Sequence, residues 1–132
     1  MLPQVEWAVK EKGYKVLVMN PNYTSDPKTE EAIPLLDTMT KHACYVWEKY
    51  VIPAKFKSIM VIAHSAGGMC LKNIQKQFPK HFYNNVSKIA LTDSSVISPK
   101  ELNTKLQKEF MLSRCVHFVA SLQPLGQEDK NN

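Results

Sequence analysis

The stretch Val61-Ile62-Ala63-His64-Ser65-Ala66-Gly67-Gly68 passes from apolar residues to a serine that is followed by small residues. A short run that is apolar on both faces is typical of a central parallel strand covered by helices. Small residues around a serine permit a sharp turn from strand to helix, the nucleophile elbow of α/β-hydrolases, whose usual pattern is G-x-S-x-G. The stretch therefore predicts an α/β fold with Ser65 at the elbow. The alternative is a tight turn in which Ser65 only caps the helix.

Strands and helices alternate along the rest of the chain. Besides the strand at residues 58–63, apolar runs predict three strands, at residues 14–19, 86–91 and 115–120. Apolar residues at helical spacing predict four helices, at residues 5–12, 34–50, 66–78 and 99–111. This order indicates βαβ units in one domain, a three-layer fold with about four parallel strands flanked by helices.

A serine nucleophile needs a histidine base and usually an acid that orients the histidine. In α/β-hydrolases these follow in the order serine, acid, histidine. Asp93 ends the predicted strand after the elbow helix and is the candidate acid, unless it is only a turn or capping residue. His117 is the one histidine that follows Asp93, and its position inside a predicted strand also fits a packed histidine. The N–H of Ala66, at the start of the elbow helix, is the candidate oxyanion donor.

Composition argues against several other classes of function. The net charge is +5, but the lysines are scattered and Arg114 is the only arginine, so direct binding to nucleic acid is not expected. Cys115 and His117 supply at most two metal ligands, and no metal or other cofactor is predicted. The three cysteines are expected to be reduced, buried thiols. Without a signal peptide or a membrane-length apolar run, we expect a soluble intracellular protein.

Five segments share their pattern with one family. They are the entry segment 9–22, which ends in N-P-N, the helix segment His42-Ala43-Cys44-Tyr45-Val46-Trp47, the elbow segment 61–68, the strand end Ala90-Leu91-Thr92-Asp93-Ser94, and the segment 115–125, which closes on Pro124-Leu125. Together they resemble the Arb2 domain family, the argonaute-binding and cotranscriptional-regulator group within the α/β-hydrolase superfamily. The Y-V-W and T-D-S patterns make the resemblance specific.

The resemblance implies a partial domain at residues 1–125, truncated at both ends, with a polar tail at residues 126–132. The family domain starts earlier, with a strand and a loop that supply the second oxyanion donor, and continues later, with a further histidine. This chain also departs from the family pattern at Ser95-Val96, where members usually carry V-H, and at Gln123 and Gly126, which replace acidic residues. We therefore expect an incomplete triad, an open sheet edge and an uncovered apolar face.

Two functions follow as expectations. The resemblance implies a non-enzymatic or degenerate member that acts through protein contacts in the nucleus and cytoplasm, with argonaute proteins, chromatin or splicing factors as partners. The alternative is a serine hydrolase for an ester or amide that uses Ser65, Asp93 and either His117 or a histidine from a missing segment. Without a base and a second oxyanion donor, such an enzyme would lose several orders of magnitude in rate.

Overall fold

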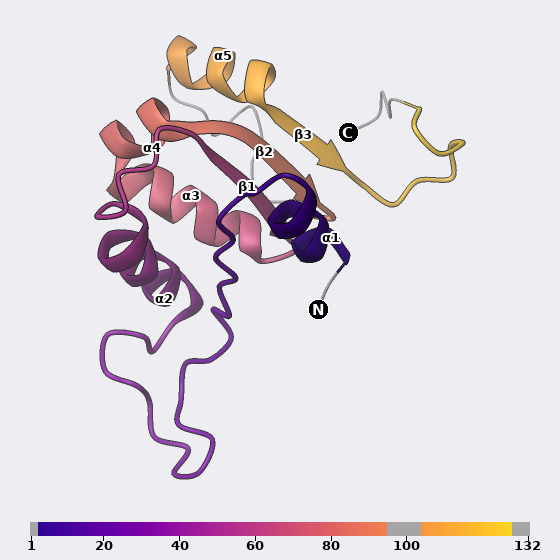
Figure 1. The fold of residues 1–132 in the computed structure, drawn as a ribbon. Helices are drawn as coiled ribbons and strands as arrows, with labels where there is room; N and C mark the ends of the chain where they lie inside the picture. Colours follow the sequence, from indigo (N-terminus) through magenta and orange to yellow (C-terminus); the bar gives the residue numbers. More distant parts are fainter. Residues whose placement is uncertain (1–2, 95–103, 128–132) are drawn as a thin grey trace.

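The described strands form one parallel sheet. The computed structural model describes residues 3–94 and 104–127. Strands β1 (Ile59–His64), β2 (Val86–Thr92) and β3 (Cys115–Phe118) lie in the order β1-β2-β3, and both neighbouring pairs are parallel (Figure 1). This confirms the α/β class and three of the predicted strands, because helices connect parallel strands that follow one another in the chain.

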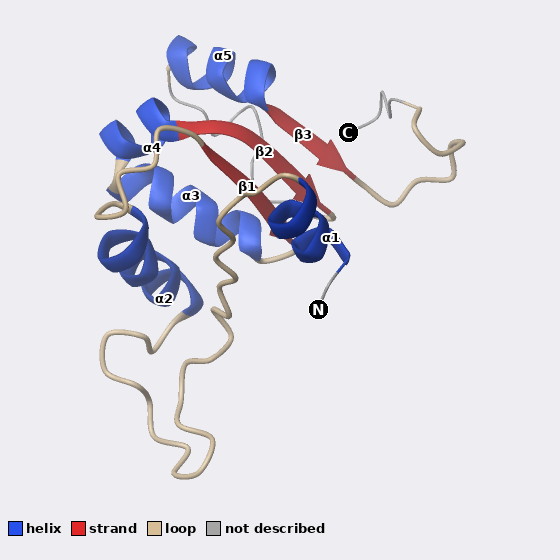
Figure 2. Cartoon of the chain, in the orientation of Figure 1, coloured by secondary structure: helices blue, strands red, loops and turns tan. Residues whose placement is uncertain are grey.

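The described helices gather beside this sheet (Figure 2). Their bounds are α1 Pro3–Glu6, η1 Trp7–Glu11, α2 Met39–Val46, η2 Trp47–Val51, α3 Gly67–Gln77, α4 Pro79–Asn85 and α5 Lys105–Arg114. Segments η1 and η2 continue α1 and α2 with the wider hydrogen bonding of a π-helix. Helix α3 packs against β1, α4 and α5 pack against β2, and α2 lies against α3.

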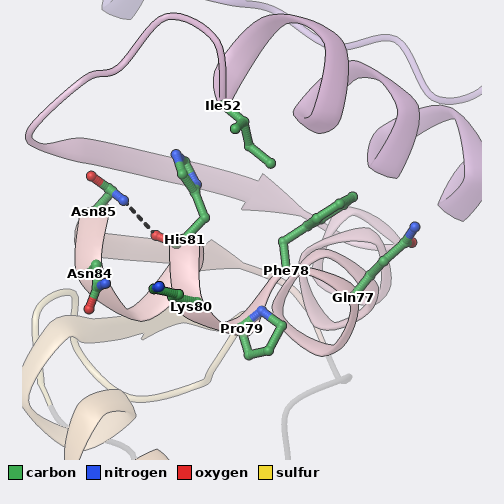
Figure 3. A pocket seen from close by; sticks show the side chains of 8 residues that line it. All are labelled: Ile52, Gln77, Phe78, Pro79, Lys80, His81, Asn84 and Asn85. Carbon is green, nitrogen blue, oxygen red and sulfur yellow. Dashed lines mark hydrogen bonds between the residues drawn. The ribbon is translucent and has the colours of Figure 1, made fainter.

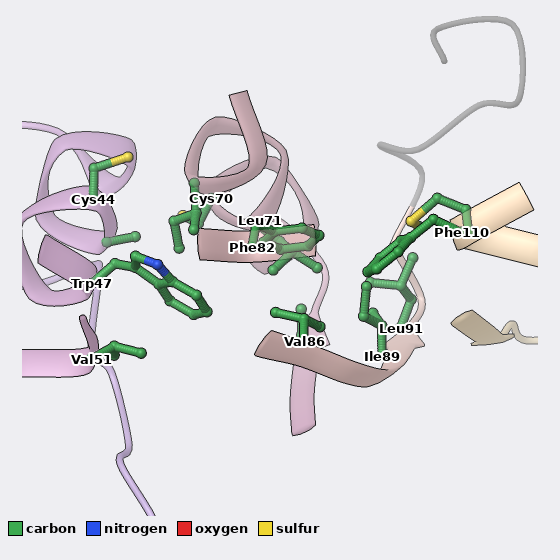
Figure 4. Close-up of a cluster of buried hydrophobic side chains, with 14 residues drawn as sticks. Cys44, Trp47, Val51, Cys70, Leu71, Phe82, Val86, Ile89, Leu91 and Phe110 are labelled. Atoms are coloured by element: carbon green, nitrogen blue, oxygen red, sulfur yellow. The ribbon is translucent and has the colours of Figure 1, made fainter. Parts of the chain in front are cut away.

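One face of the sheet meets these helices and builds the core (Figure 4). Val61 pairs with Ile89 and Ala63 with Leu91 in the β1–β2 register, so these four side chains share that face. The core that they join consists of Ala43, Cys44, Trp47, Val51, Ala63, Cys70, Leu71, Ile74, Phe82, Val86, Ile89, Leu91, Phe110 and Met111. Val86 and Phe82 are the largest side chains that are almost fully enclosed.

The opposite face of the sheet is open within the described residues. Met60, Ile62, Val116 and Phe118 alternate with the core-facing residues, and their exposed fractions are 53%, 73%, 56% and 59%. Parallel sheets are normally covered on both faces. The helices that contact the strands, α3, α4 and α5, supply core residues on one face only, so the predicted third layer is not seen in the described part of the chain. An uncovered apolar face was expected.

The predicted strand at residues 14–19 is wrong. These residues form no strand, and residues 15–19 make no backbone hydrogen bond with any described residue. Val16, Leu17 and Val18 are exposed, while Met19 packs against the core. A strand is defined by the ladder with its neighbour, and this segment has strand-type residues without a neighbour. The sheet therefore has three described strands instead of about four.

Two helix predictions need correction, and part of a third lies outside the described residues. The helix at 34–50 begins only at Met39, because the Thr38 side chain accepts a hydrogen bond from the N–H of Lys41 at 3.2 Å and caps it. Pro79 opens the additional helix α4, where a loop was predicted. The helix predicted at 99–111 appears as α5, and its predicted first residues, 99–103, lie outside the described part of the chain.

Candidate functional site

Ser65 sits at the turn between β1 and α3, as the sequence predicted. Its φ of 50° is in the left-handed region, which non-glycine residues seldom occupy. Its N–H donates to the carbonyl of Thr92 at 3.0 Å, so the turn is tied to the end of β2. A Cβ placed on Gly67 would lie 3.5 Å from the Cβ of Ala63, an ordinary contact that shows how closely strand and helix approach. Strained backbone of this kind is often found at functional sites.

The residue after Ser65 caps the N-terminus of helix α3. Ala66 is the N-cap of α3, with φ −61° and ψ −12°, and its side chain makes no capping hydrogen bond. The N–H of Gly68 turns back to the Ser65 carbonyl at 3.3 Å. The Ala66 N–H is therefore placed at a helix N-terminus, where partial positive charge favours an anion. Its part as an oxyanion donor stays a prediction.

The segment Thr92-Asp93-Ser94 joins the serine turn to the next strand. On one side, the Ser94 hydroxyl donates to the Ser65 carbonyl at 2.8 Å, which adds to the bond between Ser65 and Thr92. On the other side, the N–H of Asp93 donates to the carbonyl of Phe118 at 2.8 Å. Ser94 is only 2% exposed and is the one buried polar residue within the described part of the chain. The carboxyl ends of all three strands are thereby linked.

The candidate base, His117, is held by this same segment. Its Nε2 accepts a hydrogen bond from the N–H of Ser94 at 3.1 Å. No described residue hydrogen-bonds to the hydroxyl of Ser65. The structure thus brings His117 to Ser94 instead of to the nucleophile candidate.

His64 is also engaged away from the Ser65 hydroxyl. Its Nδ1 lies 3.0 Å from the carbonyl oxygen of Thr92 and 3.1 Å from the Thr92 hydroxyl oxygen. Because β1 and β2 pair His64 with Thr92 in register, the contact is a cross-strand one. The imidazole therefore strengthens the junction of the two strands beneath the serine turn.

The candidate acid, Asp93, lies at the same sheet edge in an unusual conformation. Its φ is 48°, which aspartate tolerates better than most residues because its short side chain bonds locally. The residue is exposed, and its carboxylate has no hydrogen-bond or ion-pair partner among residues 3–94 and 104–127. The structure therefore brings Ser65 and Asp93 to one edge through the bond between Ser65 and Thr92, without an imidazole bridging them.

The profile of the Arb2 domain matches residues 2–125, which is nearly the whole chain. The chain belongs to the Arb2 domain family. This finding agrees with the resemblance of the elbow and T-D-S segments.

Several curated proteins are similar to this Arb2 domain. The cotranscriptional regulator ARB2A homolog of Xenopus tropicalis is 33% identical over 85 residues, which is 64% of this chain and 20% of that protein. Human cotranscriptional regulator ARB2A is 32% identical over the same extent. A FAM172 family protein homolog of Caenorhabditis elegans is 32% identical over 117 residues, 88% of this chain and 36% of that protein. The chain thus spans a minor part of these relatives. No solved structure matches it.

The sequence analysis gave no role to Ser94, although in this Arb2 domain its hydroxyl bonds to Ser65 and its N–H bonds to His117. Thr92-Asp93-Ser94 stood out as a family pattern, but only Asp93 received a role. The signal for Ser94 was a small hydroxyl residue directly after a buried strand, next to a residue that favours a left-handed turn. Whether its hydroxyl faces Ser65 or solvent depends on strand pairing, which the sequence does not specify.

One pocket of the described domain, at the far end of α3 from the serine turn, is drawn in Figure 3. It has a volume of about 440 Å³ and lies between the end of η2, the end of α3 and helix α4. Ser65 precedes α3, whose eleven residues separate the two places by roughly 16 Å. His81 lines the cavity and contacts Trp47 edge to face at 5.7 Å. Burial lowers the pKa of His81, so its neutral form is favoured.

The cysteines and acidic residues supply no second reactive centre in the described part of the domain. Burial raises the pKa of the Cys44, Cys70 and Cys115 thiols, which disfavours the reactive thiolate. Cys44 and Cys70 are buried, as predicted, and Cys115 is partly buried. Within residues 3–94 and 104–127, no cluster of three or more His, Cys, Asp or Glu side chains is suited to a metal ion. No described helix has the length and apolar character to span a membrane.

Proposed function

We propose that this Arb2 domain acts through protein contacts in gene regulation and does not catalyse a reaction at Ser65. The observation that carries the proposal is the bond from the Ser94 N–H to His117 Nε2, at 3.1 Å. It occupies the nitrogen that a base would use on the serine hydroxyl. A serine without an adjacent base is a weak nucleophile. The relatives named cotranscriptional regulators support a nuclear, regulatory role.

The partners that we propose are argonaute proteins, together with chromatin or splicing factors. This proposal rests on the family resemblance and on the regulatory names of the relatives. We propose location in the nucleus and the cytoplasm. The scattered lysines and the single arginine, Arg114, favour protein contacts over direct contacts with nucleic acid.

Co-immunoprecipitation of the tagged chain tests the regulatory proposal. We expect argonaute proteins to be enriched from nuclear and cytoplasmic extracts, with equal recovery for wild type and Ser65→Ala, since the contact does not use serine chemistry. Tagged Phe82→Ala, which loses a buried core ring, serves as the control for folding-dependent binding. Recovery at the level of an untagged extract would contradict the proposal.

Serine hydrolysis is the second candidate function. Its support is the φ of 50° at Ser65 between a strand and a helix, which is the strained geometry of a nucleophile elbow. Asp93 at the neighbouring strand end and the N–H of Ala66 are the proposed acid and oxyanion donor, and His117 is the proposed base. Catalysis would require His117 to leave the Ser94 N–H, or another histidine to approach Ser65.

A fluorophosphonate probe separates the two candidates. We expect the wild-type chain to label several orders of magnitude more slowly than an active serine hydrolase, because the Ser65 hydroxyl has no described base beside it. Labelling would be followed by intact-mass spectrometry, with Ser65→Ala as the specific control and Ser58→Ala as the control for an exposed serine. Fast labelling that disappears only in Ser65→Ala would establish the hydrolase and overturn the non-catalytic proposal.

A further inference from the structure

Two pockets adjoin at the end of helix α3. The first, of about 440 Å³, is the one beside His81. The second, of about 360 Å³, lies along α2 and η2 and is lined by Leu35 and Tyr45. Gln77 lines both pockets, so together they form one groove, the α2–α4 groove. Two neighbouring pockets suit an extended peptide, which can place one side chain in each.

The first pocket combines apolar walls with polar side chains. Figure 3 shows that Ile52, from the end of η2, and Phe78 and His81, from the opposite side, extend toward the same space. The exposed carboxamides of Gln77 and Asn84 stand beside them. A carboxamide can both donate and accept hydrogen bonds, as the main chain of a bound peptide requires. Apolar walls with a few polar groups are the usual composition of a ligand site.

Two buried nitrogen atoms beside this pocket lack a hydrogen-bond partner. They are Nδ1 of His81 and Nε1 of Trp47, neither of which bonds to a described residue. The two rings meet edge to face at 5.7 Å, and Trp47 is only 2% exposed. A buried polar atom without a partner lowers stability. A ligand with polar groups would recover part of that loss at His81, which a purely apolar ligand would not.

Charge indicates the sign of the occupant. Residues 49–92 include seven lysines and no aspartate or glutamate. Lys80 lines the first pocket, is exposed, and has no ion-pair partner among the described residues. Lys41 and Lys49 line the second pocket, where acidic neighbours pair with them at 2.9 and 3.5 Å. The groove therefore favours an acidic occupant, and the net charge of +5 disfavours a second copy of the chain.

We propose that the α2–α4 groove binds an extended acidic segment of a partner protein, with an apolar side chain in the first pocket and a carboxylate beside Lys80. The inference rests on the proposed function, protein contacts, and gives it a contact surface and a partner chemistry. A peptide fits better than nucleic acid because the pockets have apolar walls. The only arginine, Arg114, is engaged elsewhere, since it donates to the carbonyl of Val86 at 2.7 Å.

Fluorescence anisotropy tests the groove on the full chain, with a short labelled peptide that alternates leucine and glutamate as the probe. We expect saturable binding in low-salt buffer, and none when lysine replaces glutamate or serine replaces leucine in the peptide. Lys80→Glu is expected to raise the dissociation constant about tenfold, because it turns an attraction into a repulsion. The matched control, Lys108→Glu on the exposed side of α5, is expected to raise it about twofold at most.

Absence of saturable binding to wild type, or equal effects of Lys80→Glu and Lys108→Glu, would overturn the inference. Equal, Lys80-dependent binding of a short polyuridine RNA would overturn the peptide as the occupant. Failure of the peptide to bind while argonaute is still recovered from extracts would remove the groove and leave the proposed function standing. Binding of the peptide without recovery of argonaute would contradict the proposed partner and support the groove.

Photo-cross-linking places the peptide on the chain. A benzophenone replaces one leucine of the peptide, and mass spectrometry identifies the residues that it labels. We expect labelling at residues 47–52 and 77–85, which border the first pocket. Labelling confined to the open face of the sheet, at residues 59–64 or 115–118, would overturn the placement.

Discussion

Phe82→Ala is expected to lower the free energy of unfolding by about 3–5 kcal/mol, the largest effect of any substitution considered for this domain. The Phe82 side chain is only 1% exposed, at the centre of the core. Its ring lies 6.3 Å from the ring centroid of Trp47, 5.6 Å from that of Tyr83 and 5.7 Å from that of Phe110. Truncation removes these contacts and leaves a cavity between η2, α4 and α5, which rigid helices fill only in part.

Urea unfolding followed by circular dichroism measures this loss at one fixed protein concentration, since self-association changes apparent stability. Phe118→Ala is the matched control, because its ring is 59% exposed on the open face of the sheet. We expect the control to change the free energy of unfolding by less than about 1 kcal/mol. Equal losses for the two variants would contradict the position of Phe82 at the centre of the core.

Ser94→Ala is expected to cost about 1–3 kcal/mol, a large effect for the loss of one hydroxyl. The Ser94 hydroxyl donates at 2.8 Å to the carbonyl of Ser65 inside a site that is 2% exposed. Its removal leaves that carbonyl with only the longer bond from Gly68, at 3.3 Å. A buried acceptor that loses its better partner retains most of its desolvation cost, which destabilises the strained turn at Ser65.

Thermal and urea unfolding of Ser94→Ala would be compared with those of Ser58→Ala. The Ser58 hydroxyl also makes a 2.8 Å hydrogen bond, to Ser87, but at the protein surface. We expect that control to lie within about 0.5 kcal/mol of wild type, because water replaces a lost surface partner. If both variants had the same free energy of unfolding as wild type, the hydrogen bond between Ser94 and the serine turn would not contribute to stability.

The strands that were predicted correctly are those whose sequence pattern matches their surroundings. The strands predicted at residues 58–63 and 86–91 appear as β1 and β2, which pair with each other, although β1 lies at the edge of the described sheet and not at its centre. Residues 14–19 have the same local character, yet they form no ladder. Strand propensity is a local property, whereas a ladder needs a neighbour at the right distance, which the segment lacks in the described fold.

The helices also divide into those that a local sequence pattern predicts and those that a tertiary contact decides. The α3 helix follows from the small residues after Ser65 and from its apolar face, and its bounds are close to the prediction. Helix α4 was missed because Pro79 looked like the end of one helix, although proline equally suits the first turn of another. Phe82, which α4 places in the core, decides in favour of the second reading. Burial of that ring is a tertiary effect.

Sequence by itself determined the parallel α/β class, the position of Ser65 between a strand and a helix, and membership of the Arb2 domain family, because each rests on a local pattern of residue types. Only the tertiary structure decided what surrounds the serine. Ser94 lies 29 residues later in the chain, and its hydroxyl donates a hydrogen bond to the Ser65 carbonyl. Its N–H donates a hydrogen bond to Nε2 of His117. Hydrogen bonds between residues so far apart depend on strand register, which local propensity leaves open.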